Sequence, residues 1–148
     1  MKLTIELIPK TSFYTNLRSI LSRKEWSDIR IDTLIKANHR CEICGGESYN
    51  RALDCHEVWI FDDENHIQKL IKIIALCDQC HEVKHIGLAQ VKGNFDRARK
   101  HFMKINNINY LEANKIINEA FYIWEQRSQY KWQLDITILK MSGVNRYE

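Results

Sequence analysis

The sequence predicts an α+β fold built around a small metal centre. Pairs of cysteines stand three positions apart at Cys41 and Cys44, and again at Cys77 and Cys80. Hydrophobic and polar residues alternate near both ends of the chain, which is typical of half-buried strands. Between them, longer segments repeat hydrophobic residues at helical spacing. Strands and helices grouped around paired cysteines indicate a small α+β core with a four-cysteine zinc, flanked by helices and terminal strands.

The chain has 148 residues and the balance of an ordinary globular protein, with 45% hydrophobic and 28% charged residues. This length fits one domain over residues 1–148. The net charge is only +3, so nucleic-acid binding would need local basic clusters rather than a strong overall field.

Cysteine usage and hydrophobicity indicate the compartment. Five cysteines, of which Cys55 stands outside the two pairs, favour metal binding in a reducing compartment over a disulfide framework. Residues 1–9 lack a charged-then-apolar signal pattern, and the chain holds no run of about 18 apolar residues. We therefore expect a soluble, cytoplasmic protein with no membrane partner.

The N-terminal part, residues 1–38, should hold a strand and two helices. Alternation over residues 2–8 predicts a half-buried strand that Pro9 ends. A short helix is expected over residues 17–21. Residues 24–38 carry a broad apolar face and predict a longer helix.

The central part should hold the metal-binding elements. Gly45 and Gly46 permit a tight turn in which backbone amides approach the cysteine sulfurs. Residues 51–60 suggest a strand and residues 62–65 a polar turn. Residues 67–76 fit strand or helix, with β-branched residues favouring a buried strand at the end. A helix should begin near Cys80 and break at residues 92–94.

The C-terminal extension, residues 88–148, should be mainly helical. Residues 95–105 predict a basic amphipathic helix and residues 110–128 a long one. Alternation over residues 132–139 predicts a strand that could pair with residues 2–8 and close the domain. The tryptophans are expected in the core rather than at a recognition surface; they are Trp26, Trp59, Trp124 and Trp132.

The paired cysteines predict a structural zinc site. A two-residue spacer lets both thiolates of a pair reach one ion, and two pairs complete a tetrahedral shell. The predicted ligands are Cys41, Cys44, Cys77 and Cys80. The segment between the pairs is longer than in compact zinc ribbons, and it contains His56.

Three histidines predict a second metal site beside the first. His81 and His85 are four residues apart, so on a helix they share a face and can reach one ion. His56 lies on the preceding predicted strand. Three imidazoles leave coordination positions open, as a catalytic metal requires.

These motifs resemble the HNH endonuclease family, also described as ββα-metal or His-Me finger proteins. The resemblance covers residues 39–87 and rests on Cys41-x-x-Cys44, the strand bearing His56, and Ala75-Leu76-Cys77-x-x-Cys80-His81. It implies a β-hairpin and a helix around one divalent ion, and many members add a four-cysteine zinc.

The resemblance also implies residue roles. His56 falls in the ligand position, Glu57 in the position of the general base, His81 in that of the closing histidine, and His85 matches an extra ligand of some members. The usual base is a histidine, so Glu57 departs from the pattern, unless His56 is the base and Asp54 or Cys55 is the ligand.

A second departure concerns the middle asparagine of the family, whose position is Lys72. Lysine cannot accept a hydrogen bond and so cannot orient a neutral imidazole as asparagine does. Asn65 or Gln68 would be the substitute if the loop length differs.

The implied activity is hydrolysis of DNA phosphodiester bonds. A divalent ion (Mg, Mn, Ni or Zn) on the three histidines would stabilise the departing oxygen, and Glu57 would take the proton of the attacking water. The densest basic cluster lies on the predicted helix 95–105, where Arg97, Lys100 and Lys104 share a face suited to phosphates. A solvated helix face is the alternative interpretation.

Two other functions fit parts of the pattern. His81-Glu82-Val83-Lys84-His85 spells the H-E-x-x-H motif of zinc peptidases, with Glu82 as base. Alternatively, the departures at Glu57 and Lys72 suit a weakly active or inactive, treble-clef-like zinc module that binds nucleic acid or a protein partner.

Overall fold

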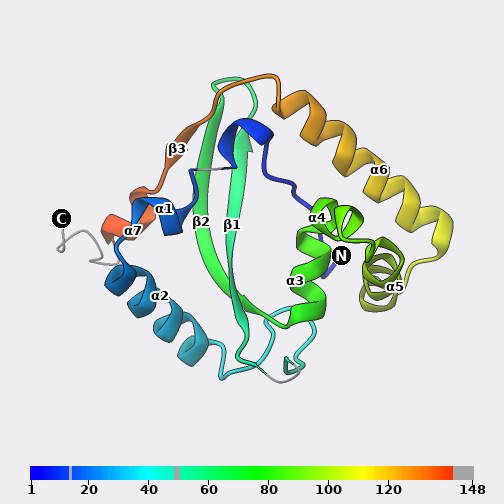
Figure 1. Ribbon diagram of the computed structural model, residues 1–148, viewed down its shortest axis with the longest axis horizontal. Helices are drawn as coiled ribbons and strands as arrows, with labels where there is room; N and C mark the ends of the chain where they lie inside the picture. The colour runs from blue at the N-terminus through cyan, green and yellow to red at the C-terminus, as the bar shows by residue number, and fades with distance from the viewer. Residues whose placement is uncertain (14, 49–50, 142–148) are drawn as a thin grey trace.

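The computed structural model describes residues 1–13, 15–48 and 51–141. Its sheet has three strands in the order β1-β2-β3, with β1 at Asp54–Asp62, β2 at Ile67–Leu76 and β3 at Gln133–Asp135. Strands β1 and β2 form a long antiparallel hairpin, and β3 lies parallel to β2 (Figure 1). The prediction of an α+β fold is confirmed.

Helices flank the hairpin on two sides (Figure 1). On one side lie α1 (Leu17–Ile20), α2 (Arg23–Lys36) and α7 (Thr137–Met141). On the other lie α3 (Asp78–Lys84), α4 (Ile86–Val91), α5 (Phe95–Asn106) and α6 (Tyr110–Arg127). A 3-10 turn, η1 (Lys10–Ser12), joins the N-terminal segment to the first group.

Local signals explain where the helices begin. Helix α2 starts with a capping box, in which the Ser22 hydroxyl accepts from the Glu25 amide and the Glu25 carboxylate accepts from the Ser22 amide. Helix α3 starts at Asp78, two residues before the expected point, because the Cys77 sulfur accepts from the Cys80 amide and caps the helix. The break expected at residues 92–94 is confirmed, since it separates α4 from α5, and a further break at His85 separates α3 from α4.

Two hydrophobic clusters hold these groups to the hairpin. One joins the end of β2 to α3–α6 and includes Leu76, Cys80 and Phe102. The other joins the middle of the hairpin to α1, α2 and α7 and includes Trp59 and Leu70. The hairpin therefore links two packed regions.

The expected pairing of terminal strands is wrong. Residues 2–8 form no strand; instead the Asn106 side chain on α5 accepts from the Leu3 amide at 3.0 Å and donates to the Leu3 carbonyl at 2.8 Å. Leu3 is fully buried. The alternation reflects burial of one side of an extended segment, not a place in a sheet.

The expected strand over residues 132–139 is largely wrong. Only β3 is a strand, and it pairs with β2. The Asp135 carboxylate accepts from the amide of Thr137, the first residue of α7, at 3.0 Å. Among the described residues, no helix has the length and hydrophobicity needed to cross a membrane.

Candidate metal centre

The four paired cysteines lie close enough together to bind a metal ion. Their sulfur atoms lie within 4.8 Å of one another, and those of Cys44 and Cys77 are 3.7 Å apart. All five cysteines of the chain are free of disulfide bonds. This part of the site matches the sequence prediction.

The loop after Cys44 provides the expected tight turn. Gly45 has a φ of +76°, a left-handed conformation that glycine adopts without strain. The Gly46 amide donates to the Cys44 sulfur at 3.4 Å, and a Cβ atom on Gly46 would lie 3.3 Å from that sulfur. The two glycines therefore shape the loop around the sulfur.

The neighbouring cysteines favour the thiolate form of Cys41. A hydrogen bond from Cys80 lowers the pKa of the Cys41 thiol to about 4, and the same interaction, followed by burial, raises the pKa of Cys80. Burial raises the pKa of Cys77 to about 11. His101, on α5, lies with its Nε2 atom 3.2 Å from the Cys80 sulfur, where a ring N–H can donate to it.

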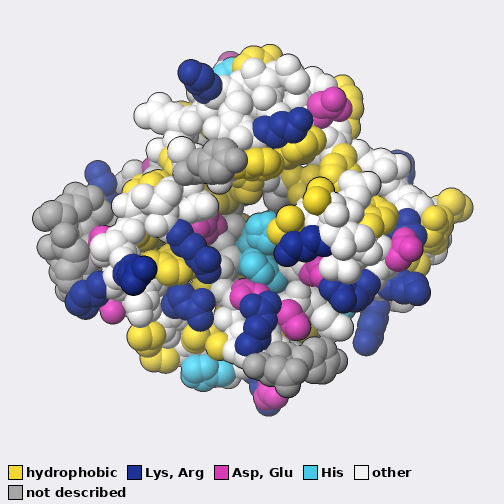
Figure 2. Space-filling model, viewed as in Figure 1, with side chains coloured by type: hydrophobic (Ala, Val, Ile, Leu, Met, Phe, Trp, Pro, Cys, Tyr) yellow, Lys and Arg dark blue, Asp and Glu magenta, His cyan; other side chains and the backbone are white. Residues whose placement is uncertain are grey.

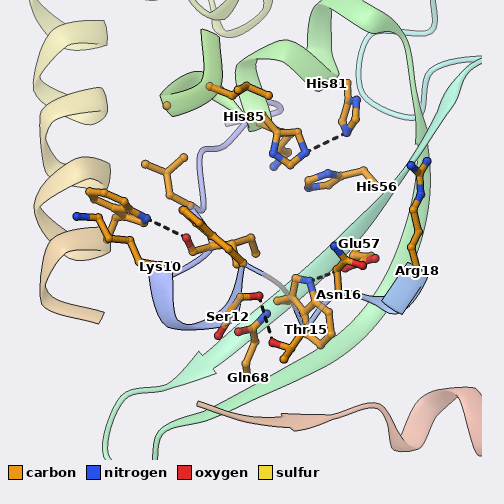
Figure 3. A pocket seen from close by; sticks show the side chains of 18 of the residues that line it. Lys10, Ser12, Thr15, Asn16, Arg18, His56, Glu57, Gln68, His81 and His85 are labelled. Carbon is orange, nitrogen blue, oxygen red and sulfur yellow. Dashed lines mark hydrogen bonds between the residues drawn. The ribbon is translucent and has the colours of Figure 1, made fainter. Parts of the chain in front are cut away.

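The three predicted histidines form a second cluster. His56 comes from β1, whereas His81 lies on α3 and His85 at its C-terminal end, and one ring nitrogen of each lies within 4.8 Å of the others. The Nε2 atoms of His81 and His85 are 3.0 Å apart, and the His56 ring lies 5.4 and 5.2 Å from theirs, centroid to centroid. Figure 3 shows the three rings facing a common point.

Burial favours the neutral, metal-binding form of these rings. It lowers the pKa of His56 to about 2 and that of His85 to about 4, and the neighbouring Lys84 lowers both further, while Asp54 opposes the shift at His85. Burial also lowers the pKa of His81, although Asp54 opposes the shift. All three imidazoles are therefore neutral at pH 7.

Asp54 orients His81, a role that the sequence analysis did not assign. The Nδ1 atom of His81 is 3.1 Å from the Asp54 carboxylate, and Arg51 binds that carboxylate through both terminal nitrogens. A proton on Nδ1 leaves Nε2 free to bind a metal. The sequence could have indicated this role, because residues 54 and 56 of a strand point to the same side and would place Asp54 beside the histidine cluster.

Glu57 follows His56 in β1 and lines the same cavity, with its carboxylate fixed by two donors. The Leu17 amide donates to one oxygen at 3.3 Å and the Trp59 indole N–H to the other at 3.2 Å. Burial raises the pKa of Glu57, against these hydrogen bonds. A higher pKa makes the carboxylate a stronger base near neutral pH.

Three residues could correspond to the middle asparagine of the HNH family, and they lie in different parts of the hairpin. Lys72 pairs with Val58 in the hairpin and is exposed. Asn65 donates to Asp62 in the hairpin turn, at the far end of β1 from His56. Gln68 is buried and lines the same cavity as the three histidines.

A cavity of about 810 Å³ opens beside the histidine cluster. It lies between the hairpin, the N-terminal segment, α4 and α6 (Figure 3). In Figure 2 histidine side chains form the floor of a central hollow, with lysine and arginine side chains around it. Three of the tryptophans expected in the core line this cavity, and of these only Trp59 is buried; they are Trp26, Trp59 and Trp124.

The basic residues predicted to bind DNA do not line the cavity. Arg97, Lys100 and Lys104 are exposed on α5, and Arg97 is paired with Glu82. The cations that line the cavity are Lys10, Arg18 and Lys84. The Glu82 carboxylate accepts a hydrogen bond from Arg97 at 2.9 Å. The residue that would be the base of a zinc peptidase is therefore already paired.

Comparisons of this chain with protein families, with curated proteins and with solved structures found no match.

Proposed function

We propose that this protein is a metal-dependent endonuclease of the HNH type, which hydrolyses phosphodiester bonds in DNA. The observation that carries the proposal is the convergence of His56, from a hairpin strand, with His81 and His85, from the following helix, on one point beside a cavity. The order hairpin–helix around this point agrees with the expected ββα-metal core.

We propose zinc as the ion of the four cysteines, with a structural role. With Zn–S bonds of about 2.3 Å, the sulfurs of a tetrahedral site are about 3.8 Å apart. The 3.7 Å between Cys44 and Cys77 fits this separation. Because Cys77 caps α3 and Cys80 lies in its first turn, the zinc would fix the helix that carries His81 and His85.

The second cluster suits a divalent ion such as Mg, Mn, Ni or Zn. When bound, it would stabilise negative charge on the phosphate and on the departing oxygen. Asp54 holds His81 in the tautomer that binds metal, and burial keeps His56 and His85 neutral. The Glu57 carboxylate, fixed on the adjacent residue, would take the proton of the attacking water.

The basic residues around the cavity support DNA as the substrate. Arg18 is exposed, and its guanidinium lies 5.6 Å from the Trp26 ring at the cavity lining. Lys84 is held by Thr4 and Glu6, and its side chain also faces the cavity. Arg18 would bind a phosphate next to the scissile bond, whereas the Lys84 ammonium is paired with Glu6; Lys100 and Lys104 on α5 would contact phosphates farther away.

A nicking assay tests the proposal. Zinc-loaded protein is incubated with supercoiled plasmid and with single-stranded DNA, each with Mg, Mn, Ni or Co. We expect cleavage with at least one of these ions and its loss in His81→Asn, since removal of one imidazole opens the ion's coordination shell.

The matched control is His39→Asn. His39 is exposed, lies before the first cysteine, and has a left-handed φ of 56°, which asparagine tolerates. This variant should cleave like the wild type. Intact DNA in every metal, or equal cleavage by wild type and His81→Asn, would contradict the nuclease assignment.

A zinc module without catalysis is the second candidate. Donors already occupy both Glu57 oxygens, and exposed Lys72 stands where the family has asparagine. Metal analysis separates the two functions. One tightly bound zinc per chain with no exchangeable ion favours a binding module for nucleic acid or protein, whereas one zinc and one exchangeable divalent ion favour the enzyme.

A further inference from the structure

The cavity beside the histidine cluster has a second end with its own chemistry. Figure 3 shows His56, His81 and His85 at one end and Gln68 with Ser12 at the other. The volume of about 810 Å³ lies within the usual range for ligand sites. The space is therefore large enough to accept more than the phosphate at the metal.

The far end carries buried polar atoms without partners. Gln68 is 2% exposed and Ser12 is 3% exposed, and both line the cavity. Neither the Gln68 Oε1 atom nor the Ser12 hydroxyl has a hydrogen-bond partner among the described residues. Buried polar groups are nearly always paired, so a polar ligand in the cavity would account for both.

Tryptophan side chains held by hydrogen bonds also line the cavity. Trp59 is buried, and its indole N–H donates to Glu57. The Trp124 indole N–H donates to the Ile8 carbonyl at 2.8 Å, which fixes the ring against the N-terminal segment. With Trp26, these aromatic side chains line the cavity that the three histidines also line.

Cations lie beside the same rings. The Lys10 ammonium is 4.9 Å from the centre of the Trp124 ring, and the Arg18 guanidinium is 5.6 Å from that of Trp26. Both residues are exposed. The cavity thus combines positive charge at its edge, aromatic walls and buried acceptors at its end.

We propose that this cavity binds the base of an unpaired nucleotide adjacent to the scissile phosphate. A base can stack on the rings and donate hydrogen bonds to Gln68 and Ser12, while its phosphates meet Lys10 and Arg18. An apolar ligand would leave the buried acceptors unpaired, and a base stacked inside a duplex could not enter. This inference rests on the proposed nuclease function and restricts its substrate to single-stranded or locally unpaired DNA.

Equilibrium binding tests the site without cleavage. The full chain carrying His81→Asn, with its zinc retained, is titrated at fixed salt with two eight-nucleotide strands, oligo(dT) and an abasic strand of the same length and charge. Stacking contacts predict that oligo(dT) binds at least about tenfold more tightly. Equal affinities would overturn the base site, whereas the plasmid assay judges the nuclease function separately.

A second substitution in the His81→Asn background assigns the preference to this cavity. Gln68→Leu and Trp26→Leu should each reduce the ratio of the two affinities by about tenfold. The matched control is Gln126→Leu, which alters an exposed glutamine of α6 outside the cavity lining. A ratio that both cavity variants retain would contradict the proposal, because the base would then be bound elsewhere.

Thermal unfolding of the Gln68 variant gives an independent readout. If Gln68 serves a ligand, Gln68→Leu removes a buried acceptor that lacks a partner, and the free protein should become no less stable. A strongly lowered Tm would mean that the glutamine supports the fold, and would contradict its assignment to ligand binding.

Discussion

At the scale of single residues, His81 connects the strand and the helix of the candidate site through its two ring nitrogens. One faces Asp54 on β1 at 3.1 Å and the other faces His85 at 3.0 Å. Carboxylates that hold a metal-binding histidine in one tautomer strengthen metal binding, and their loss typically weakens it by about 10–100-fold.

Asp54→Asn should therefore weaken binding of the second ion by about 10–100-fold while the zinc content stays unchanged. Titration calorimetry with Mn²⁺ or Ni²⁺ on zinc-loaded protein measures the affinity. Asp28→Asn is the control, since Asp28 forms an exposed pair with Lys24. An Asp54 variant that binds the ion like the wild type would exclude Asp54 from the site.

Protonation of His85 should make stability depend on pH. Burial lowers its pKa to about 4 from an ordinary value of 6.5. Between these values the unfolded chain binds a proton that the folded chain does not, so stability is lost as the pH falls from 6.5 towards 4. The loss is at most about 1.4 kcal/mol per pH unit for this group.

Urea unfolding of zinc-loaded protein at pH 6.5 and pH 5.0, without a second metal, measures this effect. His85→Gln removes the titrating group and serves as the reference. The wild type should lose up to about 2 kcal/mol more than the variant over this interval. Parallel losses in both proteins would show that His85 does not titrate in this way.

At the scale of elements, the sequence predicted structure best where one local pattern decided it. Helices α2, α5 and α6 lie close to their expected ranges. Residues 2–8 and 132–139 failed because alternation reports one-sided burial of an extended chain, and the pairing partner depends on distant contacts. Those contacts are Asn106 for Leu3 and β2 for β3.

The residues of the candidate site were likewise predictable only where a local spacing pattern identified them. Spacing alone indicated the four cysteines and the pair His81 and His85. Two cysteines separated by two residues can bind one ion, and two histidines separated by three residues lie on the same face of a helix. The Gln68 end of the cavity could not be anticipated. It depends on how the N-terminal segment and α6 pack against the hairpin.

The cysteine loop provides a prediction about backbone conformation. Gly45 is left-handed and nothing lies within 4 Å of a Cβ atom placed on it. Gly45→Ala should thus lower the free energy of unfolding by about 1–2 kcal/mol through backbone strain alone. Chemical denaturation of the zinc-loaded protein measures the change.

Gly87→Ala is the control, for which we expect a change in stability of the opposite sign. Gly87 lies in helix α4, and an added Cβ atom would make an ordinary contact with Phe121 at 3.7 Å. This substitution should stabilise the protein by about 0.5–1 kcal/mol. A Gly45 variant as stable as the wild type would mean that the loop does not hold its left-handed turn.

At the scale of the whole molecule, the cysteine cluster belongs to one of the two hydrophobic clusters, since Cys41, Cys77 and Cys80 are all buried in it. Removing the proposed zinc should therefore unfold more than a loop. We expect a strong zinc chelator to lower the Tm by roughly 10 °C or more, as loss of several kcal/mol would in a chain of this size.

The His81→Asn variant is the control for chelation. It lacks a ligand of the second cluster but keeps all four cysteines, so its Tm should fall by the same amount. An unchanged Tm in both proteins after verified loss of metal would contradict a structural role for the cysteine-bound ion.

We propose that one ion binds His56, His81 and His85 while another binds the cysteines. Crystals of the zinc-loaded protein soaked in Co²⁺ or Mn²⁺, with data collected at the absorption edge of the added metal, would locate the second ion. We predict an anomalous peak within about 2.0–2.3 Å of one nitrogen from each of the three rings. Ordered rings with no peak between them, or a peak only at the cysteines, would show that the three histidines do not bind a metal ion.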